Sequence, residues 1–159
     1  MTKLSHGRSH WTAQVMGWGL LLLYVLPAEA ATYYVATDGD DARSCATGQN
    51  INTPKRNIMG TNGGMACLTT PGDKLYVRGG TYDESVSNVS TYQLFPSGTS
   101  WDHAFTVAAY PGETVTLTQA MGFGDCCQNP PMPQMSYWIF DGFRLNATDP
   151  NNNGLLYNG

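Results

Sequence analysis

Short apolar runs separated by polar turns are the dominant pattern along this chain of 159 residues. The runs are rich in β-branched and aromatic side chains and are bounded by Gly, Pro, Asn and Asp, which is typical of β-strands. They predict six strands, with Leu155–Tyr157 as a candidate for another. The six are Thr32–Ala36, Lys74–Arg78, Phe105–Tyr110, Thr114–Leu117, Tyr137–Phe140 and Phe143–Asn146.

One helix is predicted, within Thr53–Leu68. Thr53 can cap its start, and Pro54 suits the first helical position, where a missing N–H costs nothing. Three glycines in the second half weaken a helix by up to about 1 kcal/mol each relative to alanine. We therefore expect a short helix, Pro54–Met59, followed by an irregular turn.

The strands recur with a common shape, in which a strand is followed by a glycine corner and a second strand. The corner glycines are Gly79 with Gly80, Gly112 and Gly142, so the period is about 30 residues, as in stacked repeat architectures. The runs are apolar at consecutive positions, which indicates a parallel sheet covered on both faces.

Several segments resemble the secreted right-handed parallel β-helix proteins of the pectate-lyase-like superfamily. Residues 32–41, TYYVATDGDD, resemble the opening strand and turn of that family. The other similar segments are 53–56 with 71–82 (helical cap and first coil), 97–100 with 109–113 (second coil) and 137–143 (the strand–Asp–Gly–strand unit).

The resemblance implies an all-β fold, a right-handed parallel β-helix or solenoid. Residues 31–159 would form its N-terminal cap, with a short helix, and its first three to four coils, truncated at the C-terminus. A solenoid needs such a cap because its first rung exposes unpaired backbone. A self-contained small β-sandwich is the alternative fold.

The same resemblance implies that the protein acts on or binds polysaccharide, as a lyase, epimerase or hydrolase. Calcium is a possible cofactor, because such lyases often use it. Whether the chain is an enzyme stays open, and the catalytic residues are expected mostly beyond residue 159, with Arg144 the only candidate cation on a late strand. The alternative is a non-catalytic extracellular module, such as an adhesin, a sugar-binding unit or a structural repeat. We expect a monomer at full length.

Residues 1–30 have the features of a secretion signal. Lys3 and Arg8 precede an apolar stretch from Val15 to Leu26, and Ala28-Glu29-Ala30 places small residues at the two positions that a signal peptidase reads. The apolar stretch is too short for a hydrocarbon core that needs roughly 20 residues. We therefore predict cleavage after Ala30 and a secreted protein, extracellular or periplasmic, with no membrane segment after processing.

The charge balance argues against a nucleic-acid partner. The chain has a net charge of −4. Removing residues 1–30 removes two of its eight Lys and Arg residues and makes the remainder more acidic. A nucleic-acid-binding surface requires a basic patch instead.

All four cysteines follow the predicted signal, in a compartment where disulfides persist. Four cysteines allow three connectivities. A bond between Cys45 and Cys67 closes a loop of about 22 residues, worth roughly 3 kcal/mol, and we expect it to staple the cap. A bond between the adjacent Cys126 and Cys127 forces an unusual backbone, so their role stays open. A zinc site is disfavoured because there is no CxxC pair.

The acidic residues offer two candidate clusters. Asp38, Asp40 and Asp41 crowd a glycine-bearing turn and could hold Ca²⁺, although Asp and Gly also favour turns through local hydrogen bonds. Asp83 and Glu84 would face opposite sides of a strand, which favours a solvated surface over paired acid–base chemistry.

The remaining candidates are aromatic, histidine and loop positions. His103, flanked by Trp101 and Asp102, could be an acid–base group, although an ordinary loop also accounts for it. Residues 122–134, with three prolines and two cysteines, form an irregular loop that could flank a groove. Aromatic side chains could stack on sugars, although those within strands are more often packing residues. They are Tyr33, Tyr34, Tyr76, Tyr82, Trp101, Tyr110, Tyr137 and Trp138.

Overall fold

The computed structural model describes residues 29–83, 95–118, 121–124, 135–146 and 155–158. Within them the chain is mostly β, with nine short strands, one α-helical turn and two 3₁₀ turns. Every strand pairing is parallel. This excludes the β-sandwich alternative, whose sheets are antiparallel.

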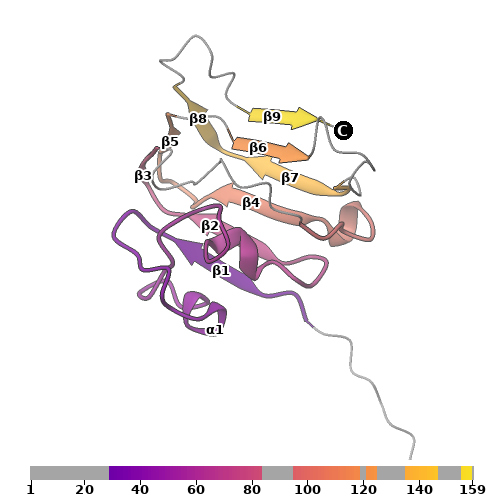
Figure 1. The fold of residues 1–159 in the computed structure, drawn as a ribbon, viewed down its shortest axis with the longest axis horizontal. Helices are drawn as coiled ribbons and strands as arrows, with labels where there is room; N and C mark the ends of the chain where they lie inside the picture. The colour runs from indigo at the N-terminus through magenta and orange to yellow at the C-terminus, as the bar shows by residue number, and fades with distance from the viewer. Residues whose placement is uncertain (1–28, 84–94, 119–120, 125–134, 147–154, 159) are drawn as a thin grey trace, which may run out of the picture.

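The strands are arranged in three sheets (Figure 1). The largest contains β1 (Thr32–Val35), β2 (Lys74–Val77), β4 (Phe105–Ala109) and β7 (Trp138–Asp141) in that order. The second contains β3 (Gly80–Tyr82), β5 (Val115–Leu117) and β8 (Phe143–Leu145). The third pairs β6 (Met121–Gly124) with β9 (Leu155–Asn158). Figure 1 shows the largest sheet rising from β1 at the cap, with β3, β5 and β8 stacked along one side of it.

The sheets are visited in a repeating order along the chain. From β4 to β9 the strands enter the first, second and third sheets and then the same three again. Lys74, Thr106 and Ile139 lie side by side in the first sheet, so the spacing of about 30 residues predicted from the glycine corners is confirmed. Gly112 and Gly142 have φ values of +80° and +77°, a conformation that side-chain-bearing residues rarely adopt.

All six predicted strands and the candidate at 155–157 are present, and no end differs from its predicted position by more than one residue. The short strands β3 and β6 were not among those predicted, and β6 (Met121–Gly124) includes the first three residues of the segment that was expected to be an irregular loop. The rest of that loop, 125–134, lies outside the described residues, as do Cys126 and Cys127.

The predicted helix at Pro54–Met59 is wrong. The helical turns are α1 (Cys45–Gly48) and a 3₁₀ turn η1 (Gly64–Cys67), on either side of it. Lys55 instead pairs with β1, donating its N–H to Tyr34 O (2.9 Å) while its carbonyl accepts from Ala36 N (2.9 Å). A local capping signal is overridden here by a long-range backbone pairing that continues the sheet.

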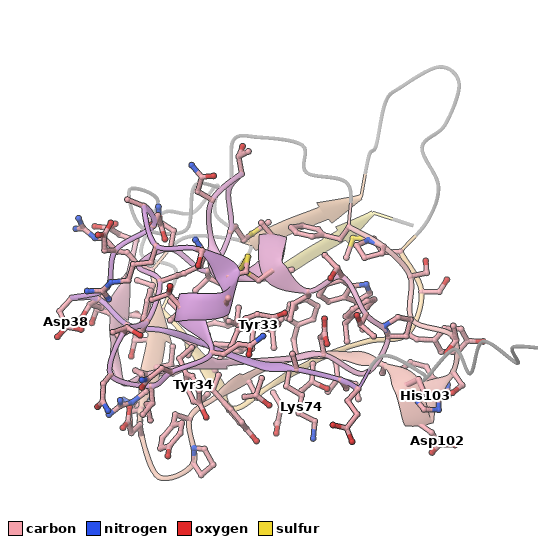
Figure 2. All side chains as sticks on the ribbon, turned by 90° about the horizontal axis from the view of Figure 1, so that it is seen from below. Tyr33, Tyr34, Asp38, Lys74, Asp102 and His103 are labelled. Atoms are coloured by element: carbon pink, nitrogen blue, oxygen red, sulfur yellow. A yellow bond between two sulfur atoms is a disulfide. The ribbon has the colours of Figure 1, made fainter. Side chains whose placement is uncertain are left out.

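The core lies on the inner side of the largest sheet. Burial alternates along β1 and β2, so that Tyr33 faces inward and Tyr34 outward, on opposite sides of β1 in Figure 2. The buried apolar side chains form one cluster. It includes Tyr33, Val35, Ile58, Met59, Met65, Leu68, Leu75, Val77, Tyr82, Phe105, Val107, Val115 and Leu117.

The first strand is covered by a cross-linked cap. Cys45 in α1 and Cys67 in η1 form the predicted disulfide, with a Cα–Cα distance of 5.4 Å. Both turns contact β1. The buried Lys55 ammonium donates to three backbone carbonyls of the cap, those of Asp41 (3.2 Å), Arg43 (2.8 Å) and Asn62 (2.6 Å). The cap is therefore held by one covalent bond and one buried cation.

Candidate functional site

The outer face of the largest sheet carries the densest arrangement of candidate binding groups. Side chains alternate across a strand, so the residues opposite the core-facing ones share this face. Thr32, Lys74, Thr106 and Ile139 form one row across the four strands. Tyr34, Tyr76, Ala108 and Asp141 form the next row. Tyr34 and Lys74 project from the same side of the sheet in Figure 2.

Three tyrosines from three consecutive strand segments meet on this face. Tyr34 and Tyr76 are register partners with stacked rings, 6.2 Å between centroids. Tyr110, just after β4, lies 5.7 Å from Tyr76 in an edge-on arrangement and 6.3 Å from Tyr34. All three rings are half-buried. We call Tyr34, Tyr76 and Tyr110 the tyrosine cluster.

An ion pair borders the tyrosine cluster. Arg78 Nε lies 2.9 and 3.0 Å from the two carboxylate oxygens of Glu113, and its second terminal nitrogen lies 2.8 Å from Oε1. The Arg78 guanidinium carbon lies 5.0 Å from the centre of the Tyr110 ring, within the range of a cation–π contact. Arg78 thus connects the cluster to the turn that precedes β5.

The ion pair shifts the titration of both partners. Hydrogen bonding to Arg78, and then to the Gly79 N–H, lowers the pKa of the Glu113 carboxyl. Hydrogen bonding to Glu113 raises the pKa of Arg78. Both side chains therefore stay charged at neutral pH, and the Arg78 charge is already neutralised.

Tyr82 anchors Arg78 from the core side. Its buried hydroxyl donates to the Arg78 carbonyl at 2.9 Å. Burial raises the pKa of Tyr82, and the Glu113 and Asp38 carboxylates add to the effect. Tyr82 is therefore a neutral structural donor rather than an acid–base group.

A second, more exposed aromatic group lies at the opposite end of the strands. Trp101, in the 3₁₀ turn η2 (Trp101–His103), is 68% exposed, and its ring lies edge-on to Tyr137 at 5.3 Å. Tyr137 has φ +59°, the only positive value among the non-glycine residues that the structure describes. It holds this strained conformation at the entry to β7, where its carbonyl accepts from Phe105 N at 3.0 Å.

The eight candidate aromatic residues fall into three classes. Tyr33 and Tyr82 belong to the core, and Trp138 packs on Phe105 at 4.8 Å. The other two classes lie at the surface, and they are the tyrosine cluster and the Trp101–Tyr137 pair. Sequence alone could not separate them, because the separation depends on which face of a sheet each residue occupies.

The acidic turn of Asp38, Asp40 and Asp41 is organised by backbone donors. One oxygen of Asp41 accepts from the N–H groups of Arg56 (2.8 Å) and Asn57 (3.0 Å). Asp40 accepts from Ala42 N at 2.9 Å. Across the described ranges, no group of three or more His, Cys, Asp or Glu side chains is arranged to hold a metal ion.

His103 and Asp38 lie at opposite ends of the parallel strands (Figure 2). His103 and Asp102 are exposed in η2, before β4 begins, whereas Asp38 follows the end of β1. The structure therefore does not bring His103 together with the acidic turn. Asp83 and Arg144 are exposed, and Glu84 lies outside the described residues.

Three charged residues with clear structural roles were not singled out from the sequence. They are Lys55, Asp73 and Glu113, and their partners lie many residues away. Only Glu113 had a signal in the sequence, the repeat length, because residues about one repeat apart become neighbours in the sheets.

The chain matches no family model, and neither a curated protein nor a solved structure matches it. In the part of the chain with a described structure, no helix combines the length and apolar character needed to cross a membrane.

Proposed function

We propose that this chain is the N-terminal part of an exported right-handed parallel β-helix, and that it binds or acts on a polysaccharide through the outer face of its largest sheet. The observation that carries the proposal is the tyrosine cluster with the cations Lys74 and Arg78 on one sheet face. The described residues favour a binding role for this face, with any catalytic groups supplied elsewhere.

The strand order supports the β-helix. β2, β4 and β7 are consecutive members of one parallel sheet, and each connection passes through the second sheet. A crossover between parallel strands of one sheet is right-handed in about 98% of cases, which gives the coil its hand. The covered first strand fits the capped end of such a stack.

The chemistry of the face supports a glycan ligand. Half-buried tyrosine rings offer apolar surface with a polar hydroxyl, which suits the amphipathic faces of sugar rings. Lys74 is exposed at the edge of this face and can contact a uronate carboxylate. Arg78 is already paired with Glu113, so its part is to hold Tyr110 in place.

The proposal is tested by titrating the exported protein with pectate, alginate and neutral glycans, with and without a chelator. We expect binding to one class, and Tyr76→Ala to weaken it about tenfold while Tyr76→Phe, which keeps the ring, retains it. Trp101→Ala removes an exposed ring outside the cluster and should leave the affinity unchanged. If binding requires the Lys74 side chain, the bound glycan is an acidic one.

Three outcomes would contradict the proposal: no binding to any glycan, equal binding by Tyr76→Ala, or loss of binding only in Trp101→Ala. Loss of binding with chelator would support the calcium expected from the sequence. Release of unsaturated or reducing ends from the bound glycan would distinguish an enzyme from a non-catalytic module.

A further inference from the structure

Asp73 is a buried carboxylate that accepts from three backbone N–H groups, and no described residue forms a salt bridge with it. Only 1% of its surface is exposed. One oxygen accepts from the N–H groups of Thr69 (2.9 Å) and Thr70 (2.8 Å), and the other accepts from Ala31 N at 2.7 Å. The ion pair of Arg78 with Glu113 does not involve Asp73. A buried charge is normally paired with an opposite charge, and the described residues of the unprocessed chain give Asp73 backbone donors but no cation.

The third donor is the first residue after the predicted signal cleavage site. Glu29 and Ala30 are exposed, Ala31 is half-buried against the core, and β1 begins at the next residue. The Ala31 carbonyl accepts from Lys74 N at 2.8 Å. Both the N–H and the carbonyl of Ala31 are therefore hydrogen-bonded, which fixes its position. The chain is therefore tied into the sheet from Ala31 onward.

We propose that export processing between Ala30 and Ala31 creates the missing cation, an α-ammonium group that forms a buried ion pair with Asp73. An endopeptidase hydrolyses the peptide bond. Water supplies the hydroxyl of the new Ala30 carboxyl group and one proton to the Ala31 nitrogen, which takes a further proton at neutral pH. The amide N–H that donates to Asp73 in the precursor becomes a charged donor at the same position.

The ion pair between the Ala31 ammonium group and Asp73 would stabilise the mature fold. Charge-assisted hydrogen bonds are roughly twice as strong as neutral ones. Asp73 directly precedes β2, and its carbonyl accepts from Thr106 N in β4 at 3.1 Å. The ion pair would therefore join the mature N-terminus before β1 to β2 and β4 of the largest sheet. The inference rests on the proposed export signal and is independent of glycan binding.

The first test is to export the full chain and determine the N-terminus of the product. We expect it to begin at Ala31. A product beginning at any other residue would overturn the inference.

The second test moves the ammonium group without changing Asp73. One alanine inserted between Ala30 and Ala31 leaves an extra residue on the processed chain, and displaces the charge by about 3.8 Å along the backbone. Mass spectrometry confirms the extension. We expect the extended protein to have an unfolding equilibrium constant about tenfold larger at pH 6.5. In an Asp73→Asn background the same extension should have no effect, and an equal effect in both backgrounds would refute the pairing.

If Asp73→Asn does not fold, the ion pair is tested by measuring the stability of the native and extended proteins as a function of pH. The other titratable or charged groups on the neighbouring segments are Lys74, which follows Asp73, and His103 with Asp102, where His103 lies near Gly72. The native and extended proteins both contain them. An α-ammonium group paired with a carboxylate has a raised pKa, so its stabilisation is complete below about pH 8 and is lost as pH rises through the raised value. The stability difference between native and extended proteins should therefore shrink between pH 7 and pH 10, and a constant difference would contradict the ion pair.

Discussion

Arg78 and Glu113, 35 residues apart in the chain, form a bidentate ion pair between the end of β2 and the turn before β5. The pair connects two successive turns of the stacked strands at the same place where Arg78 contacts Tyr110. The electrostatics of the candidate surface are therefore set by a contact between two successive strand–corner–strand repeats rather than within one.

Glu113→Gln should destabilise the protein by about 0.5 kcal/mol at pH 7, a small effect because the pair is partly exposed and screened by salt. Folding lowers the pKa of Glu113. The carboxylate therefore stabilises the protein at pH values above its unfolded-state pKa of about 4.3, and this stabilisation is lost as the pH falls through its folded-state pKa. Denaturant unfolding at pH 7 and pH 3 measures this. The difference between the two proteins should narrow as the pH is lowered from 7 to 3, and Asp102→Asn, which removes an exposed carboxylate, serves as the control.

Lys55→Met should cost about 2–4 kcal/mol of unfolding free energy, because three backbone carbonyl groups of the cap lose the buried ammonium group that donates to them. Arg56→Met, at the exposed neighbouring position, should change stability by less than about 0.5 kcal/mol. Urea unfolding of both variants tests the contrast. Equal effects would show that the Lys55 contacts contribute nothing specific.

Replacing Cys45 and Cys67 together by serine should lower the free energy of unfolding by about 3 kcal/mol, because the bond closes a loop with a sequence separation of 22. We expect the melting temperature to fall by roughly 10 °C and the uncovered first strand to promote aggregation. Calorimetry and light scattering measure the two effects. Unchanged thermal stability would show that the cap does not depend on its disulfide.

Tyr137→Gly should be more stable than Tyr137→Ala by about 1 kcal/mol. Both variants lose the ring that contacts Trp101, but only glycine adopts φ +59° without strain. Chemical denaturation of the two variants isolates the backbone strain. An alanine variant as stable as the glycine variant would contradict the left-handed conformation.

The strands could be predicted because their signals are local. Runs such as Thr32–Val35 combine β-branched and aromatic side chains and end at glycine and aspartate turns. The helix prediction failed for the converse reason. Thr53 and Pro54 form a good local start signal, but Lys55 lies close enough to β1 to pair with its backbone, and no local pattern reports that proximity.

The individual residues of the candidate surface could be predicted from the sequence, but their arrangement could not. Tyr34, Tyr76 and Tyr110 were recognised as aromatic candidates, but they could not be distinguished from the buried Tyr33 and Tyr82. Buried and surface tyrosines are distinguished by the pleated backbone of the sheet, in which successive side chains point to opposite faces.

The sequence by itself determined seven of the nine described strands, the glycine corners and the spacing of the repeat, because composition and turn chemistry encode them locally. It favoured the Cys45–Cys67 disulfide among three connectivities, and the structure decided that pairing. Only the tertiary structure decided the pairings of Arg78 with Glu113, Lys55 with the cap carbonyls and Asp73 with the Ala31 N–H. These contacts arise when parallel strands stack in register, which brings together residues that the chain keeps far apart.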